Sequence, residues 1–284
     1  MPALIIARLT FLEALRRRIV LAALVLGAGF LVLYGVGVGL MVREMARAYT
    51  GSPATSALFR AGLASFLGMA GLYAVNFLAI AMGALVTADT LAGEISSGTI
   101  QALATKPLRR ADIVLGKWLG LAVLLGLYLA LMAGSVLLIV YVLAGYVVPG
   151  VPAGLALIYL EVLLVMSLAL ACSSTFSTLA TGGIVFGMWG IAFIGGWVEQ
   201  IGAVMQAQTA INVGIISGLL MPSEALWRRA SYEMTPPLAR SLDFSMAGPF
   251  LTTSVPSLLA VLYAGLYLVA AVALAVSRFN RRDL

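Results

Sequence analysis

No charged side chain interrupts residues 118–160, which read WLGLAVLLGLYLALMAGSVLLIVYVLAGYVVPGVPAGLALIYL. A helix that crosses a membrane needs only about 20 apolar residues, so this stretch is long enough for two crossings. Residues 149–152 (PGVP) divide it, because proline removes a backbone donor and glycine tolerates a sharp turn. The stretch therefore predicts two membrane-spanning helices joined by a short turn.

The rest of the chain has the same character. Hydrophobic residues make up 62% of the sequence and charged residues only 10%, whereas soluble proteins are roughly half apolar. The polar segment 172–178 divides another charge-free run in the same way. We therefore expect an all-α integral membrane protein that forms a single transmembrane domain over residues 1–284. Its six predicted spans are 19–41, 63–87, 115–145, 153–174, 178–198 and 254–277.

The basic residues predict the orientation of these spans. Positive charge concentrates in cytoplasmic segments, and placing the amino terminus inside puts eleven of the 17 Lys and Arg residues there. Those eleven are Arg8, Arg16, Arg17, Arg18, Lys106, Arg109, Arg110, Lys117, Arg278, Arg281 and Arg282. Both termini should then face the cytoplasm of a prokaryotic cell, with the chain in its inner membrane. The net charge of +6 is explained by topology and contact with membrane lipid, so nucleic acid is not an expected partner.

Residues 1–18 precede the first span and have a helical pattern of their own. Apolar side chains recur at helical spacing, with Arg8, Glu13 and Arg16 opposite them. This pattern predicts an interfacial helix along the inner membrane surface. The alternative is a simple extension of the first span.

Residues 199–253 form the predicted extracytoplasmic loop. Its apolar patch, 211–221, is too short to cross a membrane, which indicates a re-entrant or interfacial segment. Pro222 then begins a short amphipathic helix that runs through Trp227 and Tyr232.

Missing residue types exclude several kinds of chemistry. The chain has no histidine and one cysteine, Cys172, so histidine-based hydrolase, metalloprotease and haem sites and intrachain disulfides are excluded. Gly116 and Lys117 lack the other residues of a phosphate-binding loop. We therefore predict no catalytic, metal-binding or cofactor-binding residue in this chain.

A polar island, residues 88–114, lies between the second and third spans. Asp89 or Thr90 could cap a short helix over 91–105, which Pro107 would stop. One face of that helix carries apolar or small side chains at four-residue steps, namely Leu91, Ile95, Thr99 and Leu103. A second flank is small, with Ser96, Ser97 and Gly98.

Such a helix is suited to insertion into the groove of a partner protein. Beyond it, Arg109, Arg110 and Lys117 could hold the inner lipid surface, and Asp112 could cap the third span. The alternative is an ordinary inner loop anchored by its basic residues.

Two polar residues fall inside predicted spans. Glu161 lies about a third of the way into the fourth span, where a carboxylate is costly enough to indicate a function, such as lining a path at a dimer seam. A hydrogen-bonded or protonated helix contact is an equally good explanation. Asn76, in the second span, is a candidate for the same path or for an interhelical hydrogen bond.

The island resembles the inner loop of type 2 ABC exporter permeases. That family's pattern is an acidic residue, a Gly-Thr pair, a leucine-rich turn, Pro, a basic residue and a Leu-Gly-Lys opening the third span. The matching residues here are Glu94, Gly98, Thr99, Leu103, Pro107, Arg109 or Arg110, and Leu115-Gly116-Lys117. Residues 219–229 also resemble a Leu-Asn-Pro turn of the subgroup that contains the permease for nitrous oxide reductase maturation, although Met221 replaces the Asn.

The resemblance implies a permease that relies on a separate cytoplasmic ABC ATPase subunit for ATP-driven export. The helix between spans two and three would then be a cytoplasmic coupling helix, with Ile95, Thr99 and Leu103 against the ATPase and Glu94 and Gly98 setting its geometry. ATP would be bound by the partner, and this chain would need no cofactor. A second permease copy is a further expected partner, and an extracytoplasmic accessory protein is another candidate. A secondary transporter and a membrane-anchored scaffold protein are the alternatives.

Overall fold

The computed structural model describes residues 2–48, 53–96, 109–236 and 255–281. Every regular element within these ranges is an α-helix. The helices are α1 (Pro2–Leu15), α2 (Arg18–Ala48), α3 (Pro53–Ser96), α5 (Arg110–Ala144), α6 (Val151–Ser173), α7 (Thr178–Val204), α8 (Gln208–Leu220), α9 (Ser223–Met234) and α11 (Leu258–Asn280).

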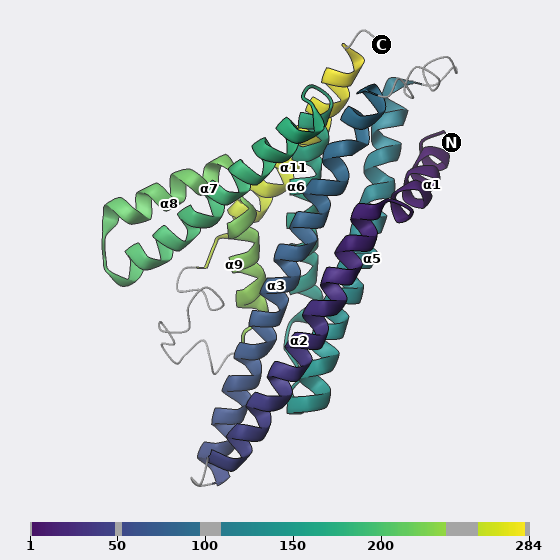
Figure 1. Cartoon of the computed structure of the whole chain (residues 1–284). Helices are drawn as coiled ribbons and strands as arrows, with labels where there is room; N and C mark the ends of the chain where they lie inside the picture. Colours follow the sequence, from purple (N-terminus) through teal and green to yellow (C-terminus); the bar gives the residue numbers. More distant parts are fainter. Residues whose placement is uncertain (1, 49–52, 97–108, 237–254, 282–284) are drawn as a thin grey trace.

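Six of these helices contain a stretch that is long and apolar enough to cross a membrane. They are α2, α3, α5, α6, α7 and α11, in the chain order that the sequence predicts. The described residues are thus all-helical, as expected, and contain six candidate membrane spans. Figure 1 shows both chain ends at one end of the bundle, which we call the termini end.

The turn between α5 and α6 follows from its glycines. Gly145 ends α5 with a φ of 64° and Gly150 precedes α6 with a φ of 61°, a left-handed conformation that glycine adopts without strain. A Cβ on Gly150 would lie 2.2 Å from the backbone oxygen of Glu233, near the end of α9. The turn therefore tolerates no side chain at this position, and its conformation brings α9 close to the start of α6.

The centre of the bundle is formed mainly by α3, α5 and α6. On α6, Val162, Leu164 and Val165 are fully buried and belong to one continuous apolar core. By contrast, α2 and α11 present many large apolar side chains outward, such as Leu33 and Leu259. An outer surface of this kind suits contact with lipid chains.

The second span differs from its prediction. We expected it to end near residue 87 and a new helix to begin at a cap on Asp89 or Thr90, but α3 is continuous to Ser96. Thr90 donates from its hydroxyl to the Val86 carbonyl within the same helix, at 2.8 Å. Nothing in residues 88–96 breaks the helix, since there is no proline and extending an existing helix costs little. The remainder of the predicted 91–105 helix, from 97 onward, lies outside the described residues.

The fifth span leads into a helical hairpin that the sequence treated as part of an outer loop. α7 extends to Val204, and α8 returns along it, so that the pair projects from the bundle in Figure 1. The two helices approach closely at Gly202, where an added Cβ would lie only 2.7 Å from the Ala210 Cβ.

The chain then bends by 104° between α8 and α9. Pro222, expected in the first turn of a helix, is the N-cap residue of α9. This helix is more enclosed than an amphipathic surface helix would be, since Trp227 and Met234 are fully buried against the bundle.

Candidate functional site

The last turns of α3 are joined to α5 by a buried ion pair. Lys117 donates to Glu94, and the Lys117 side chain is only 4% exposed. Residues 97–108 connect the two helices, so the pair joins the helix before the predicted coupling segment to the helix after it. Lys117 is predicted to hold the lipid surface, but its side chain is buried instead. It pairs with Glu94 because a buried ammonium needs a carboxylate partner.

Asp89, five residues before Glu94 on α3, forms a second junction. Arg17, between α1 and α2, donates to its Oδ2 at 3.2 Å and also to Glu13 at 2.7 Å. The Thr178 hydroxyl, at the start of α7, donates to the Asp89 Oδ1 at 3.2 Å. The carboxylate thus bridges three segments of the chain. Its side chain is 42% exposed, so its contribution is mainly to geometry rather than to stability.

The first helix packs on glycines at the start of α5. A Cβ on Gly116 would lie 2.7 Å from the Ala3 carbonyl oxygen, and one on Gly120 would lie 2.5 Å from that of Ala7. This four-residue spacing lets two helix backbones approach closely. This role was not predicted, although the four-residue spacing between Gly116 and Gly120 is visible in the sequence.

The buried face of α1 also differs from the predicted apolar stripe. Ile6, Thr10 and Ala14 are buried, whereas Leu4 and Leu9 are 60% and 62% exposed. A separate amino-terminal helix therefore exists, with apolar side chains on its outer face. Its location at the membrane surface remains a prediction.

The two arginines at the start of α5 have different environments. Arg109 is the exposed N-cap residue, with no side-chain capping bond, and Asp112 follows in the first turn rather than at the cap. Arg110 donates to the carbonyl oxygen of Asn280 at 3.3 Å and to that of Phe279 at 3.5 Å. A guanidinium at the end of α11 satisfies carbonyls that have no partner within the helix. Arg110 thus ties α5 to α11.

The structure describes only part of the predicted coupling residues. Glu94 is placed in its ion pair, and the backbone of Ile95 belongs to the last turn of α3. The Ile95 side chain, with Gly98, Thr99, Leu103 and Pro107, lies outside the described residues.

A second polar cluster lies within the bundle. The Asn76 amide on α3 donates to the Glu161 carboxylate on α6 at 3.1 Å, and the two residues are 4% and 1% exposed. The structure therefore brings together the two candidate path residues. The contact is the hydrogen-bonded kind that stood as the alternative for Glu161.

Three more charged residues, none of them predicted, lie on α7 and α9, and one of them, Glu224, interacts electrostatically with Glu161. Arg228 on α9 donates to both oxygens of Glu199 on α7, at 2.7 and 3.0 Å, a two-pronged geometry that guanidinium and carboxylate groups favour. Glu224 is 6% exposed and lies one turn before Arg228 on α9. All three fall within or beside the predicted outer loop, where charge would ordinarily be solvated. Only the fold of α7, α8 and α9 shows that they are buried.

Aromatic side chains enclose one side of this cluster. Tyr73 on α3 contacts Trp227 on α9, with ring centroids 4.9 Å apart. Phe193 on α7 contacts Trp189 at 5.2 Å and Trp197 at 5.9 Å. The Tyr73–Trp227 contact and the Arg228–Glu199 ion pair link α9 to α3 and α7, while α9 packs most extensively against α6.

Six apolar helices with outward apolar surfaces and polar contacts inside the bundle define a multi-pass membrane protein. A family model described as "ABC-2 family transporter protein" matches residues 4–284, and the chain belongs to this family. It is thus a membrane permease, the transmembrane transport component of an ABC transporter. The comparison with curated proteins found no match.

Proposed function

We propose that this chain forms the translocation path of an ABC exporter and receives force from its separate ATPase subunit at residues 94–107. The ATPase would bind and hydrolyse ATP in the cytoplasm, so the permease itself would need no cofactor. A second permease copy would complete the transporter. The proposal includes the subgroup that residues 219–229 resemble, because this segment contains the 104° bend between α8 and α9.

One observation carries the proposal: the end of α3 is fastened to neighbouring helices on both sides of its last turns. Glu94 is paired with Lys117 on α5, and Asp89 accepts from Arg17 and from Thr178 at the start of α7. Packed helices move as units between discrete arrangements. A push on the segment after Ser96 would therefore reach several spans at once, as coupling to an ATPase requires.

The proposed orientation places the termini end in the cytoplasm of a prokaryotic cell, at its inner membrane. The beginning of α5 lies at the same end as the end of α11, because Arg110 contacts the Asn280 carbonyl. Most basic residues belong to segments at this end, in line with the positive-inside rule.

The buried charges and the bent α8–α9 pair favour one alternative, a secondary transporter, which would need charged groups and broken helices inside the membrane. Membership in the ABC-2 family favours the ABC permease. Neither the buried charges nor membership in the family requires the transported substrate to pass Glu161. Purification of the native complex distinguishes the two functions.

The experiment is affinity purification of the tagged full chain from its own membrane, followed by mass spectrometry and an ATPase assay. We expect a P-loop ATPase to co-purify, and its binding or coupling to be lost in Gly98→Trp while the protein stays folded in the membrane. Gly29→Trp is the matched control, because a side chain at this position on α2 would meet open space. Unchanged coupling in Gly98→Trp would contradict the docking assignment. A homo-oligomer without ATPase activity would support the secondary transporter or the scaffold.

A further inference from the structure

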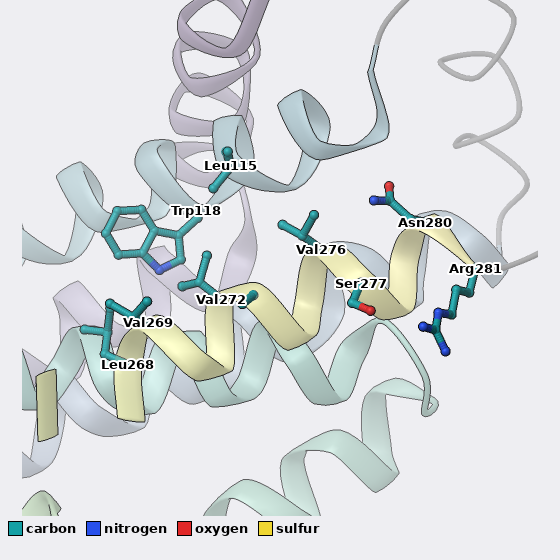
Figure 2. Close-up of a pocket in the computed structure, with 10 residues that line it drawn as sticks. Leu115, Trp118, Leu268, Val269, Val272, Val276, Ser277, Asn280 and Arg281 are labelled. Atoms are coloured by element: carbon teal, nitrogen blue, oxygen red, sulfur yellow. The ribbon is translucent and has the colours of Figure 1, made fainter. Parts of the chain in front are cut away.

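An apolar groove of about 670 Å³ runs between α5 and α11. In Figure 2, Val269, Val272 and Val276 line it on α11, facing Leu115 and Trp118 on α5. The Trp118 indole is held in place because its Nε1 donates to the Ser167 hydroxyl at 2.8 Å. The groove therefore has a fixed aromatic wall and an aliphatic wall.

The termini end of the groove is polar and basic. Ser277, Asn280 and Arg281 complete its lining there. A second cleft, of about 550 Å³, lies on another side of α11 and is also lined by Arg281, together with Arg278 and Thr175. Neither arginine has an ion-pair partner among the residues that the structure describes. Within the described part of the chain, positive charge without an ion-pair partner thus stands where the apolar groove ends.

The length of the groove matches one leaflet of a membrane. Val269 and Arg281 are twelve residues apart on α11, which corresponds to about 18 Å at a rise of about 1.5 Å per residue. The hydrocarbon core of a bilayer is about 30 Å thick, so one leaflet provides about 15 Å. An acyl chain that follows the groove would therefore place its headgroup at the level of Asn280 and Arg281.

Charge complementarity decides between the candidate occupants. A symmetric contact with a second copy through this groove would bring Arg278 and Arg281 of both copies together, and like charges in a close interface are unfavourable. A phosphate headgroup instead matches the Arg281 guanidinium that lines the groove, since guanidinium groups bind phosphate through paired hydrogen bonds. Arg110 also satisfies the last carbonyls of α11, which would otherwise repel an anion.

We propose that the α5–α11 groove binds an anionic phospholipid from the leaflet at the termini end. Its acyl chain lies against Trp118 and Val272, and its phosphate contacts Arg281 and Asn280. The site is independent of ATPase coupling, so the proposed function and this site can fail separately. A lipid here would join α5, which follows the coupling segment, to the last helix of the chain.

The test uses the full chain, purified and reconstituted in bilayers of phosphatidylcholine containing phosphatidylglycerol with brominated acyl chains. Bromine quenches tryptophan fluorescence at contact distance. The chain has four tryptophans, so the Trp118 signal is taken as the difference between the parent protein and Trp118→Phe, and we expect it to be quenched at low phosphatidylglycerol content. Arg281→Glu should raise the phosphatidylglycerol content needed for half-quenching about tenfold, because it replaces an attractive charge by a repulsive one. Arg43→Glu, an exposed charge reversal near the far end of α2, should leave it unchanged.

A second variant removes the acyl site without changing charge. Val272→Trp should fill the groove and abolish retention of phosphatidylglycerol in native mass spectrometry, whereas Leu262→Trp, on the outward face of α11, should retain it. Equal retention in Val272→Trp and the parent protein would overturn the proposal. So would an equal shift in Arg43→Glu and Arg281→Glu. A disulfide-linked dimer of Val272→Cys in a Cys172→Ala background would show that a second copy fills the groove, and would also overturn it.

Discussion

The Glu94–Lys117 pair provides the most direct test of the junction at the end of α3. Replacing Lys117 by Met keeps a long flexible side chain but leaves the Glu94 carboxylate without its ammonium partner. Breaking a buried ion pair in this way costs about 3–5 kcal/mol. Because the Glu94 side chain is 14% exposed and so partly solvated, we expect the lower end, about 3 kcal/mol.

The assay is thermal unfolding of the detergent-purified protein, followed by tryptophan fluorescence at one fixed scan rate. A loss of about 3 kcal/mol lowers the Tm of a domain of this size by roughly 6–12 °C, at about 2–4 °C for each kcal/mol. The double variant Glu94→Leu/Lys117→Met removes both charges at once. Since an apolar pair of similar volume often replaces a buried ion pair without loss, its Tm should return to within about 4 °C of the parent.

The comparison of single and double variants separates the effect of losing the Lys117 charge beside Glu94 from the loss of packing. Equal lowering of the Tm by the two variants would show that packing, rather than charge, holds α3 against α5. An unchanged Tm in Lys117→Met would refute the reasoning altogether, because it would mean that the carboxylate finds another partner or solvent.

Three further variants test the other contacts. Gly116→Leu should detach α1 from α5 and cost about 1–3 kcal/mol, measured by Tm and by protease cleavage near residue 16, whereas Gly134→Leu should have no effect because that position is open. Arg228→Met should lower the Tm by an amount comparable to that of Lys117→Met, because it leaves the buried Glu199 unpaired; no change would place Glu199 in solvent. Glu161→Gln keeps an acceptor for Asn76 and should preserve both Tm and transport, while loss of transport alone would assign the carboxylate to the path.

The number and order of the spans could be predicted because apolar length is a local property of the sequence. Residues 118–160 show this well: their charge-free run and the PGVP turn indicate two helices, and α5 and α6 are divided at that turn. The end of the second span could not be predicted in the same way. Asp89 is a residue type that is favoured at helix caps. Its carboxylate instead accepts a hydrogen bond from Arg17, which is 72 residues away in the sequence.

The partners of the buried charges likewise could not be predicted from the sequence. Lys117 lies only two turns inside α5, where a long side chain could extend to the lipid surface, and nothing local shows that Glu94 faces it instead. Glu199 and Arg228 are separated by a hairpin whose fold depends on close approach at glycines such as Gly202. Pairings of this kind depend on tertiary structure, and single-sequence patterns report only the face on which a residue lies.

Besides α3, which carries Asn76 and Asp89, α7 also links the two polar clusters. Near its beginning, Thr178 contacts Asp89 on α3, and near its end, Glu199 holds Arg228 on α9. If α3 is displaced at the termini end, as ATPase coupling requires, α7 can carry that displacement along its length, because a packed helix shifts as a unit. The hairpin and α9 would then move relative to Tyr73, at the aromatic contact with Trp227. Force applied at the coupling segment would therefore change the packing around the buried charges without any direct contact between the two regions.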